Sequence, residues 1–334
     1  MFHLLLAIVF PLIWTNMPEA NSEQASLSDK PIKLTAGSTK VLAIPSFAAE
    51  TGPQCDSSGN LYFRTGRSPR TTVVLKIAAR DDAATVYQVT DQAASESYFV
   101  AFHVGSQHRI AILMGGKHDE PSVYQFNEQD PLRVSNTAIE APAGLSASSI
   151  QSFVILPNDH ILLQGYFGEG TPDDKIGHSY LAEFAPSGKL LRLSLNKASE
   201  DVLKSVAQRG AKTEAAQGQD GMTYLLTADR VIVFSHAGSV DREIKLSPPE
   251  SGYYPDVLYS HARRLVVGFY PSPVPGKPVK HALFQLLDPS DGEVLRTFET
   301  ASELGNNLVC FSDEGLTFLK VDNRQLKLVS APIR

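Results

Sequence analysis

Cysteine is scarce in this chain, because only Cys55 and Cys310 occur among 334 residues. Two cysteines so far apart give no CxxC redox motif and no zinc-finger spacing, and they exclude a small disulfide-stapled domain. Basic residues are not concentrated either: 30 Lys and Arg are scattered among 36 Asp and Glu, for a net charge of −6. Nucleic-acid binding needs a basic patch, so we expect no nucleic-acid partner.

Sequence motifs of the common catalytic sites are also missing. The chain has no GxSxG nucleophile elbow, no HExxH zinc motif, no Walker phosphate loop and no GxGxxG between a strand and a helix. Their absence favours a protein that binds over one that catalyses. We expect no resident cofactor, apart from a divalent cation that loop carboxylates could hold.

Long apolar runs are limited to one, at the start of the chain. Leu4–Trp14 is too short to span a bilayer but matches the core of a signal peptide, although no Lys or Arg precedes it. We therefore expect a signal peptide at residues 1–20 and a flexible leader at 21–37. The protein would then be exported, periplasmic or extracellular, with no further membrane span. A short uncleaved anchor or a wrongly assigned start of the sequence is the alternative.

What the chain does contain is a repeated pattern of short strands. The segment Gln217–Leu246 shows it best, with apolar runs at Met222–Thr227, Val231–Ser235 and Val240–Leu246 separated by turns that contain Asp or Gly. Period-2 alternation is typical of half-buried strands, and such turns are typical of hairpins. The segment therefore predicts an antiparallel meander.

Comparable meanders recur along the chain. Equivalent positions in their first turns, about 50 residues apart, are Gly59, His108, Asp159, Gly221, Arg263 and Gly315. Four strands per unit at this period are typical of β-propeller blades. The sequence thus predicts an all-β, six-bladed β-propeller over residues 38–334, and we expect a monomer. An open β-sandwich or two smaller barrels is the alternative, although neither needs a constant repeat.

Two segments depart from the repeat. The sixth unit has only three strands, and an isolated strand, Val41–Pro45, precedes the first unit. We predict that this strand pairs with Leu326–Ser330 and closes the ring, which removes two open sheet edges. Between blades three and four, Ser199–Gln208 has apolar residues at helical spacing behind a serine cap and predicts a short helix.

The lengths of the connections indicate a functional face. In each blade the first-to-second and third-to-fourth turns share one face of the ring, here called the tight-turn face. The remaining connections form the opposite, long-loop face, and long loops on a rigid scaffold commonly carry binding sites. The candidates on this face are Arg67, Arg70, His118, Asp119, Glu120, Asp173, Asp174, His178 and His281. They could equally be ordinary solvated loop charges.

A second group of candidates marks the start of each innermost strand, where the long-loop face meets the ring centre. The group comprises Glu50, Glu96, Gln151, Gln219, Tyr254, Asp256 and Asn307. A polar ring of this kind fits a water-filled channel, a small-ligand site or a cation site. The sequence leaves these alternatives open.

The repeat resembles the six-bladed propellers of the NHL, TolB-like and gluconolactonase-like groups, through D-x-x-G-x-L turns such as Asp56–Leu61. The segment Glu50–Asp56, ETGPQCD, is similar to the Glu-Gly-Pro motif of gluconolactonase-like enzymes, with one inserted residue and Cys55 in place of an aromatic. The resemblance implies a metal-binding Glu50 at the channel mouth, with Asp256 as the one plausible Asp ligand. Asn158, the candidate Asn ligand, falls on the tight-turn face.

The two cysteines fall in the innermost strands of blades one and six, which are neighbours if the ring closes. A disulfide between them would lock the closure in an exported protein. Alignment of the turns, however, sets Cys55 opposite Phe311, so Cys310 is one position out of register. A disulfide and two buried free thiols therefore both remain open.

Two functions follow from these patterns. The first is an exported, non-catalytic scaffold that binds a protein, peptide or glycan through its long-loop face. The alternative is a metal-dependent, lactonase-like hydrolase with a divalent ion at the channel mouth.

Overall fold

The computed structural model describes residues 30–44, 52–65, 71–78, 84–90, 97–105, 109–142, 145–169, 176–197, 215–227, 229–271, 281–305 and 307–333. Within these ranges the chain is almost entirely β-structure, with one 3-10 turn, η2 (Ala147–Ser149). No helix that these residues form is long and apolar enough to cross a membrane. The predicted helix Ser199–Gln208 lies outside the described residues.

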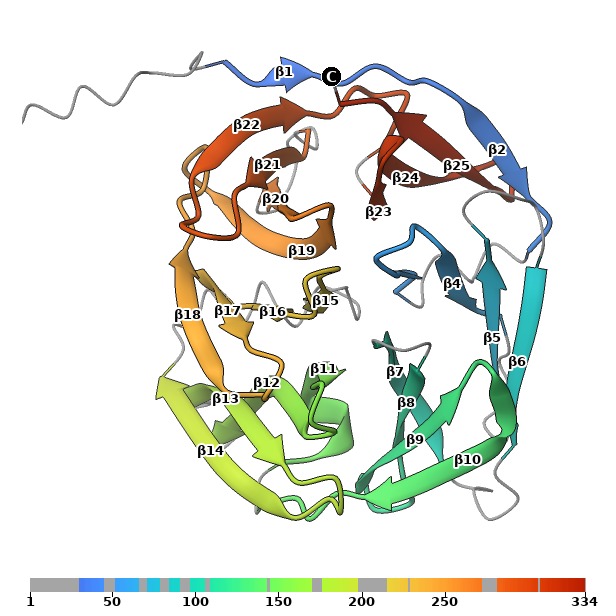
Figure 1. Ribbon diagram of the computed structural model, residues 1–334, viewed down its shortest axis with the longest axis vertical. Helices are drawn as coiled ribbons and strands as arrows, with labels where there is room; N and C mark the ends of the chain where they lie inside the picture. Colours follow the sequence, from blue (N-terminus) through green and yellow to red (C-terminus); the bar gives the residue numbers. More distant parts are fainter. Residues whose placement is uncertain are drawn as a thin grey trace, which may run out of the picture. The chain divides into compact units, whose positions relative to one another are not determined.

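Six antiparallel sheets follow one another around a ring (Figure 1). Blades one to three consist of β3 (Gln54–Cys55), β4 (Leu61–Arg64), β5 (Thr71–Ile77) and β6 (Ala84–Thr90); β7 (Tyr98–Val104), β8 (Arg109–Gly115), β9 (Pro121–Asn127) and β10 (Asp130–Ala138); and β11 (Ile150–Ile155), β12 (Ile161–Glu169), β13 (Ile176–Phe184) and β14 (Leu190–Lys197). The first strand of each blade is innermost and the fourth is outermost.

The second half of the ring repeats this arrangement. Its blades consist of β15 (Ala215–Gln217), β16 (Thr223–Leu226), β17 (Arg230–Phe234) and β18 (Val240–Lys245); β19 (Tyr253–His261), β20 (Arg264–Pro271), β21 (Leu283–Leu287) and β22 (Val294–Glu299); and β23 (Leu308–Ser312), β24 (Gly315–Asp322), β25 (Gln325–Ala331) and β2 (Thr39–Leu42). The predicted six-bladed propeller is confirmed.

Tight turns set the register of the blades. In blade one, Gly59 has a φ of 83°, a left-handed conformation that glycine adopts without steric cost. In blade five the two turn residues Ala262 and Arg263 both have positive φ, which is the geometry of the two-residue hairpin turn that matches strand twist. The chain therefore reverses at Gly59 and Arg263, two of the equivalent repeat positions that the sequence marks.

The hydrophobic core is divided among the junctions between neighbouring blades. At the junction of blades five and six, the rings of Phe284 and Phe318 meet edge to face with centroids 5.5 Å apart. Blades one and two pack through a separate cluster that includes Tyr62 and Ile110. Full burial of such a side chain contributes roughly 1.5–3 kcal/mol. Because the partners come from different blades, each blade depends on its neighbours for stability.

An N-terminal strand closes the ring, as predicted. Strand β2 pairs antiparallel with β25, from Thr39 opposite Val329 to Leu42 opposite Leu326, and completes blade six. Its bounds lie slightly earlier than the predicted Val41–Pro45. A further short strand, β1 (Ile32–Lys33), pairs in parallel with β22 of blade five. No pattern in the sequence indicates this pairing, because two residues are too few for a periodic signal.

Candidate functional site

Asp119 is the best-anchored of the long-loop candidates. It lies in the connection between β8 and β9 with a φ of 64°, a left-handed conformation that Asp tolerates better than most residues. Its carboxylate accepts hydrogen bonds from the Tyr98 hydroxyl, from the Ser148 amide at 3.0 Å and from the Ser148 hydroxyl at 2.6 Å. Its backbone carbonyl accepts from the Ala147 amide at 2.7 Å. Asp119 thus joins this connection to the one that leads into blade three.

The neighbours of Asp119 present their side chains differently. His118 and Glu120 are exposed on either side of it, so the same short loop offers an imidazole and a carboxylate to solvent. The proposed oxygen-rich cation cluster would need the Asp119 carboxylate, which already accepts three hydrogen bonds. The geometry therefore assigns Asp119 to holding the loop and leaves its two neighbours available to a partner.

Blade five supplies the second group of candidates, at the start of β19. Tyr254 is half-buried, whereas Asp256 is only 2% exposed. Asp256 lies at a β-bulge, because the pairing of β19 with β20 shifts between Pro255 and Val257. Burial, followed by the negative charge of Asp256, raises the pKa of Tyr270 well above its usual value. The innermost strand of blade five thus carries a buried carboxylate, whose charge acts on Tyr270 of β20.

Among the remaining candidates that the structure describes are His178 and His281. His178 pairs with Phe167 in the β12–β13 ladder, and His281 is exposed just before β21, where its carbonyl accepts a 3.0 Å hydrogen bond from the Tyr253 hydroxyl. Outside the described residues lie Glu50, Arg67, Arg70, Asp173 and Asp174.

Of the ligand set that the resemblance implies, the structure describes Asn158 and Asp256 but not Glu50. The Asn158 side chain donates to the Ala237 carbonyl at 2.9 Å on the tight-turn face, away from Asp256 at the start of β19. Among the described residues, no group of three His, Cys, Asp or Glu side chains comes close enough together to hold a metal ion.

The tight-turn face shows an arrangement that the sequence reading missed. At least one side-chain link crosses each junction between neighbouring blades near this face. From the junction of blades one and two onward, the links are Lys76–Glu128 (2.6 Å), Arg109–Asp159, Asn158 to the Ala237 carbonyl (2.9 Å), Arg242 to the Pro289 carbonyl (2.7 Å), His261–Asp313 (2.7 Å) and Cys55–Cys310. We call these six links the interblade belt.

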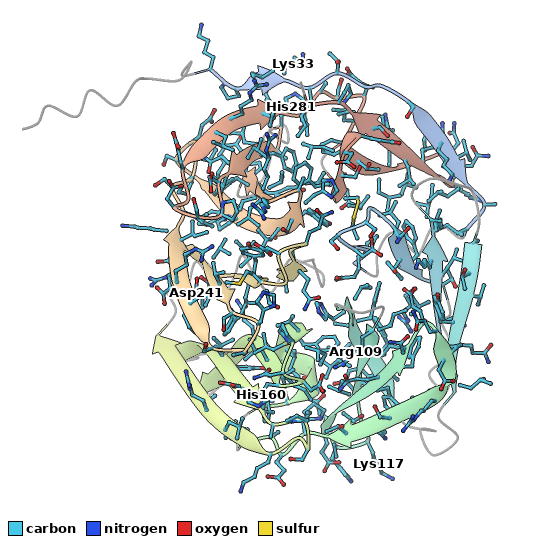
Figure 2. All side chains as sticks on the ribbon, viewed as in Figure 1. Lys33, Arg109, Lys117, His160, Asp241 and His281 are labelled. Carbon is cyan, nitrogen blue, oxygen red and sulfur yellow. A yellow bond between two sulfur atoms is a disulfide. The ribbon has the colours of Figure 1, made fainter. Side chains whose placement is uncertain are left out.

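In each link of the belt, at least one partner lies in a tight turn or directly before one. The links lie at different distances from the ring centre: Figure 2 shows Arg109 on the inner side of blade two, whereas Asp241, next to Arg242, lies on the outer rim of blade four. A signal for the belt does exist in the sequence. Several partners are about one repeat apart, with separations of 52, 50, 47 and 52 residues.

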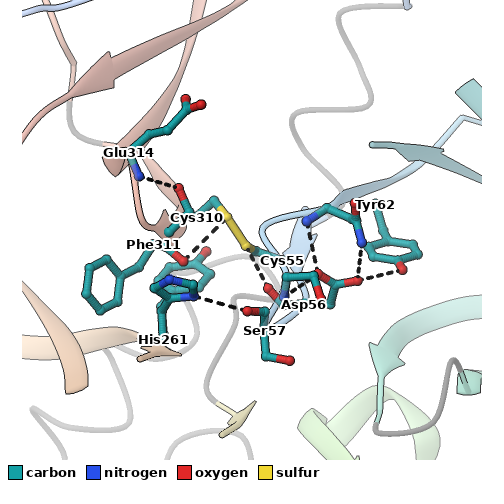
Figure 3. The surroundings of a disulfide bond; sticks show 12 residues. Cys55, Asp56, Ser57, Tyr62, His261, Cys310, Phe311 and Glu314 are labelled. Atoms are coloured by element: carbon teal, nitrogen blue, oxygen red, sulfur yellow. Dashed lines mark hydrogen bonds between the residues drawn. A yellow bond between two sulfur atoms is a disulfide. The ribbon is translucent and has the colours of Figure 1, made fainter. Parts of the chain in front are cut away.

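The sixth link is a disulfide between Cys55 and Cys310, whose Cα atoms are 5.2 Å apart (Figures 2 and 3). Of the two alternatives that the sequence left open, the structure therefore has the disulfide. It joins the innermost strands of blades one and six, which also contact one another directly. A covalent bond thus lies on the inner side of the ring closure, and the β2–β25 pairing lies on the outer side.

The turn that follows Cys55, Asp56–Asn60, reaches across the ring centre, and we call it the crossing turn. The Ser57 carbonyl accepts a hydrogen bond from Gln219 Nε2 of blade four at 3.0 Å. It accepts another from His261 Nδ1 of blade five, also at 3.0 Å (Figure 3). Blade four is opposite blade one in the ring. Gln219 lies in the tight turn between β15 and β16, so its predicted place at the long-loop end of an innermost strand was wrong.

The chain matches no protein-family model and no curated protein sequence. Similar solved structures include a luciferin-regenerating enzyme (12% identity, TM-score 0.47, covering 89% of this chain and 97% of that chain). A gluconolactonase from Xanthomonas campestris (15%, 0.45, 91% and 95%) and apo AztD from Citrobacter koseri (15%, 0.44, 80% and 69%) are others. At identities and TM-scores this low, the likenesses carry no argument about function.

Proposed function

We propose that this protein is an exported scaffold that binds a protein, peptide or glycan through its long-loop face. The interblade belt is the observation that carries the proposal. Links at all six junctions hold the blades in fixed positions from the tight-turn side. Loops supported by a rigid scaffold are the usual place for recognition, because their side chains can be held ready for a partner.

The disulfide supports export. Disulfides persist in oxidising compartments and are rare in reducing ones. The Cys55–Cys310 bond therefore agrees with the signal-peptide pattern at Leu4–Trp14. Secretion of a tagged full-length chain, with its mature N-terminus read by mass spectrometry, tests this part. Retention inside the cell with both thiols alkylated would overturn it.

The proposed contact surface begins at the loop that Asp119 anchors. His118 and Glu120 are exposed there and have no part in the anchoring hydrogen bonds described above. The crossing turn occupies the tight-turn end of the ring centre, so a partner that enters the centre would come from the long-loop side. A polar partner fits this loop better than an apolar one, because both free side chains can donate or accept hydrogen bonds.

Arrays of glycans and of peptides, probed with the purified full-length protein, test the proposal. The double variant H118A/E120A should weaken binding of the strongest array ligand about tenfold, which corresponds to the loss of one or two good contacts. The matched control K189A/E314A changes one basic and one acidic exposed residue of the tight-turn face and should leave binding unchanged. Equal losses in both variants, or no ligand on either array, would overturn the proposal.

Metal analysis separates this function from the lactonase-like alternative. One observation favours the alternative, the buried Asp256 carboxylate in the innermost strand of blade five. A hydrolase of that kind would hold about one divalent ion per chain. Mass spectrometry of elements in the purified protein should find substoichiometric metal in both the natural chain and D256N. A full equivalent that D256N loses would favour the hydrolase instead.

A further inference from the structure

We propose that the Cys55–Cys310 disulfide is a thiol–disulfide exchange site, and that its reduction by a dithiol releases the crossing turn from the ring centre while the ring stays closed. The site does not depend on what the long-loop face binds. It follows from three features of the structure: a second closure of the ring, the internal bonding of the crossing turn, and the unequal exposure of the two cysteines.

The first feature is that the ring has two independent closures. On the outer side, β2 and β25 pair over four residue positions, from Thr39–Val329 to Leu42–Leu326. On the inner side, the disulfide ties β3 to β23. Backbone pairing of the outer strands does not involve either sulfur atom. Breaking the disulfide therefore removes the inner closure and leaves the outer one in place.

The second feature is that the crossing turn is bonded internally. One carboxylate oxygen of Asp56 accepts from the amides of Ser58 and Asn60, both at 2.9 Å, and the other accepts from the Asn60 side chain at 2.7 Å. The Tyr62 hydroxyl of β4 also donates to that second oxygen, at 3.0 Å. The turn can therefore move as one unit about its attachment to β4. With the disulfide broken, two hydrogen bonds that the Ser57 carbonyl accepts still hold the turn across the ring centre, and water can replace both.

The third feature is that the two sulfur atoms differ in exposure. Cys310 is 2% exposed and packs among apolar residues, whereas Cys55 is half-buried. An attacking thiolate of a dithiol therefore reaches Cys55 first. A new S–S bond forms at Cys55 Sγ, the original bond breaks, and the electron pair leaves with Cys310 Sγ, which takes a proton.

The second thiol of the same reagent completes the exchange. As a thiolate, it attacks the reagent's first sulfur atom, which is bonded to Cys55 Sγ in the mixed disulfide. The electron pair of that bond leaves with Cys55 Sγ, which also takes a proton. The protein gains two electrons and two protons, and the dithiol is oxidised to its disulfide. The proposed partner, in the compartment to which the protein is exported, is accordingly a reduced dithiol. It is either a small molecule or a protein with paired thiols.

Hydrogen exchange of the full-length protein tests the proposal, with dithiothreitol as the reductant under native conditions. Brief alkylation with iodoacetamide should label Cys55 before Cys310. Amides of the crossing turn, and of the turn that contains Gln219, should then exchange about tenfold faster. Amides of β2 and β25 should keep their protection. The variant C55S/C310S should show the same pattern without reductant, and Q219A, with its disulfide intact, should not.

Three results would overturn the proposal. The disulfide could resist dithiothreitol until the protein is denatured, in which case it is only a structural bond. Exchange in β2 and β25 could rise together with that of the crossing turn, which would show that the ring opens. Unchanged exchange in the crossing turn of the reduced natural chain would show that other contacts hold it. The reduced natural chain decides these outcomes even if C55S/C310S does not fold.

Discussion

Hydrogen bonds join blades to one another on one face of the ring and join loops to one another on the other face. On the tight-turn face, turns and strand ends of one blade bind the next blade, as His261 binds Asp313 and Arg242 binds the Pro289 carbonyl. On the long-loop face, Asp119 binds one connection to another, through Ser148 and Ala147. The first arrangement fixes the positions of blades, whereas the second fixes the shape of a loop. Damage to the first should therefore lower global stability, and damage to the second should act locally.

The largest expected effect comes from removing the disulfide. The variant C55S/C310S should lose about 4–5 kcal/mol in the free energy of unfolding, because a very long loop is no longer constrained in the unfolded chain. Urea denaturation of the oxidised natural chain and of the variant measures the difference. Far-ultraviolet circular dichroism should stay the same, since β2 still pairs with β25. A loss of less than about 1 kcal/mol would remove the disulfide from the account of global stability.

Acid should weaken the junction of blades two and three through His103. This residue is 2% exposed near the tight-turn end of β7, meets Phe153 of blade three edge to face, and has its pKa lowered to about 4 by burial. The unfolded chain binds the proton more readily than the folded chain does. The stability that buried, neutral His103 contributes is therefore complete at neutral pH and is lost as the pH falls from 6.5 towards 4. At pH 4 the cost is about 3 kcal/mol.

The variant H103F isolates that effect. Its ring can still pack against Phe153 but cannot take a proton. Urea unfolding of both proteins at about pH 7 and about pH 4 should show the natural chain losing about 3 kcal/mol more than the variant. Equal losses would mean that His103 is not responsible for the acid sensitivity of this junction.

A smaller and local effect is expected at Asp119. The variant D119A loses three carboxylate hydrogen bonds and places alanine at a positive φ. The free energy of local opening at this loop should fall by about 1–2 kcal/mol. Amides of η2 should exchange faster, while the midpoint of global unfolding changes little. The control D119N tolerates the same backbone conformation and should recover part of the protection. A full shift of the global midpoint would contradict the distinction between the two faces.

The smallest effect is expected within the belt itself, at Arg109. The side chains of Arg109 and Asp159 are 30% and 49% exposed, so solvent screens their attraction. The variant R109A should therefore lose less than about 1 kcal/mol in urea unfolding. A larger loss would show that the links of the belt act cooperatively, which a double-mutant cycle of R109A with D159A would measure.

The sequence predicted the number of blades and their closure because both depend on periodic patterns. Apolar alternation and turn residues recur in every unit, and the missing fourth strand of blade six requires a partner from elsewhere. The belt cannot be predicted from local patterns. Asp is common in turns, so Asp159 and Asp313 look like ordinary turn residues whether or not they bind the next blade. Their partners can be predicted only from the repeat, by looking for polar pairs about one unit apart.

The disulfide shows how a correct alignment can suggest the wrong conclusion. Residues at the same position of adjacent blades point the same way around the ring, so two of them cannot face one another. Phe311, which aligns with Cys55, points into the cluster shared with blade five, whereas Cys310 packs with Leu61 and Phe63 of blade one. The offset of one position, which counted against the bond, is what turns the two sulfur atoms toward each other.

The candidate site was predicted less well, and for a physical reason. Side chains on loops are placed by contacts with other loops, and these contacts carry no period. Asp119 looked like a cation ligand beside His118 and Glu120, but hydrogen bonds from Tyr98 and Ser148 give it an anchoring role. Asp256 lies near the start of an innermost strand, as predicted, because the repeat does define that position.

The pairing of β2 with β25 also sets an order in time. During synthesis, β2 leaves the ribosome before all the strands of blades one to six that follow it, and β25 leaves after every one of them. Such a distant contact has a high entropic cost before it forms, so it is expected late in folding. Until then, blade six lacks its outermost strand and β25 keeps an unpaired edge. An incompletely folded chain can pair with a non-native strand at that edge.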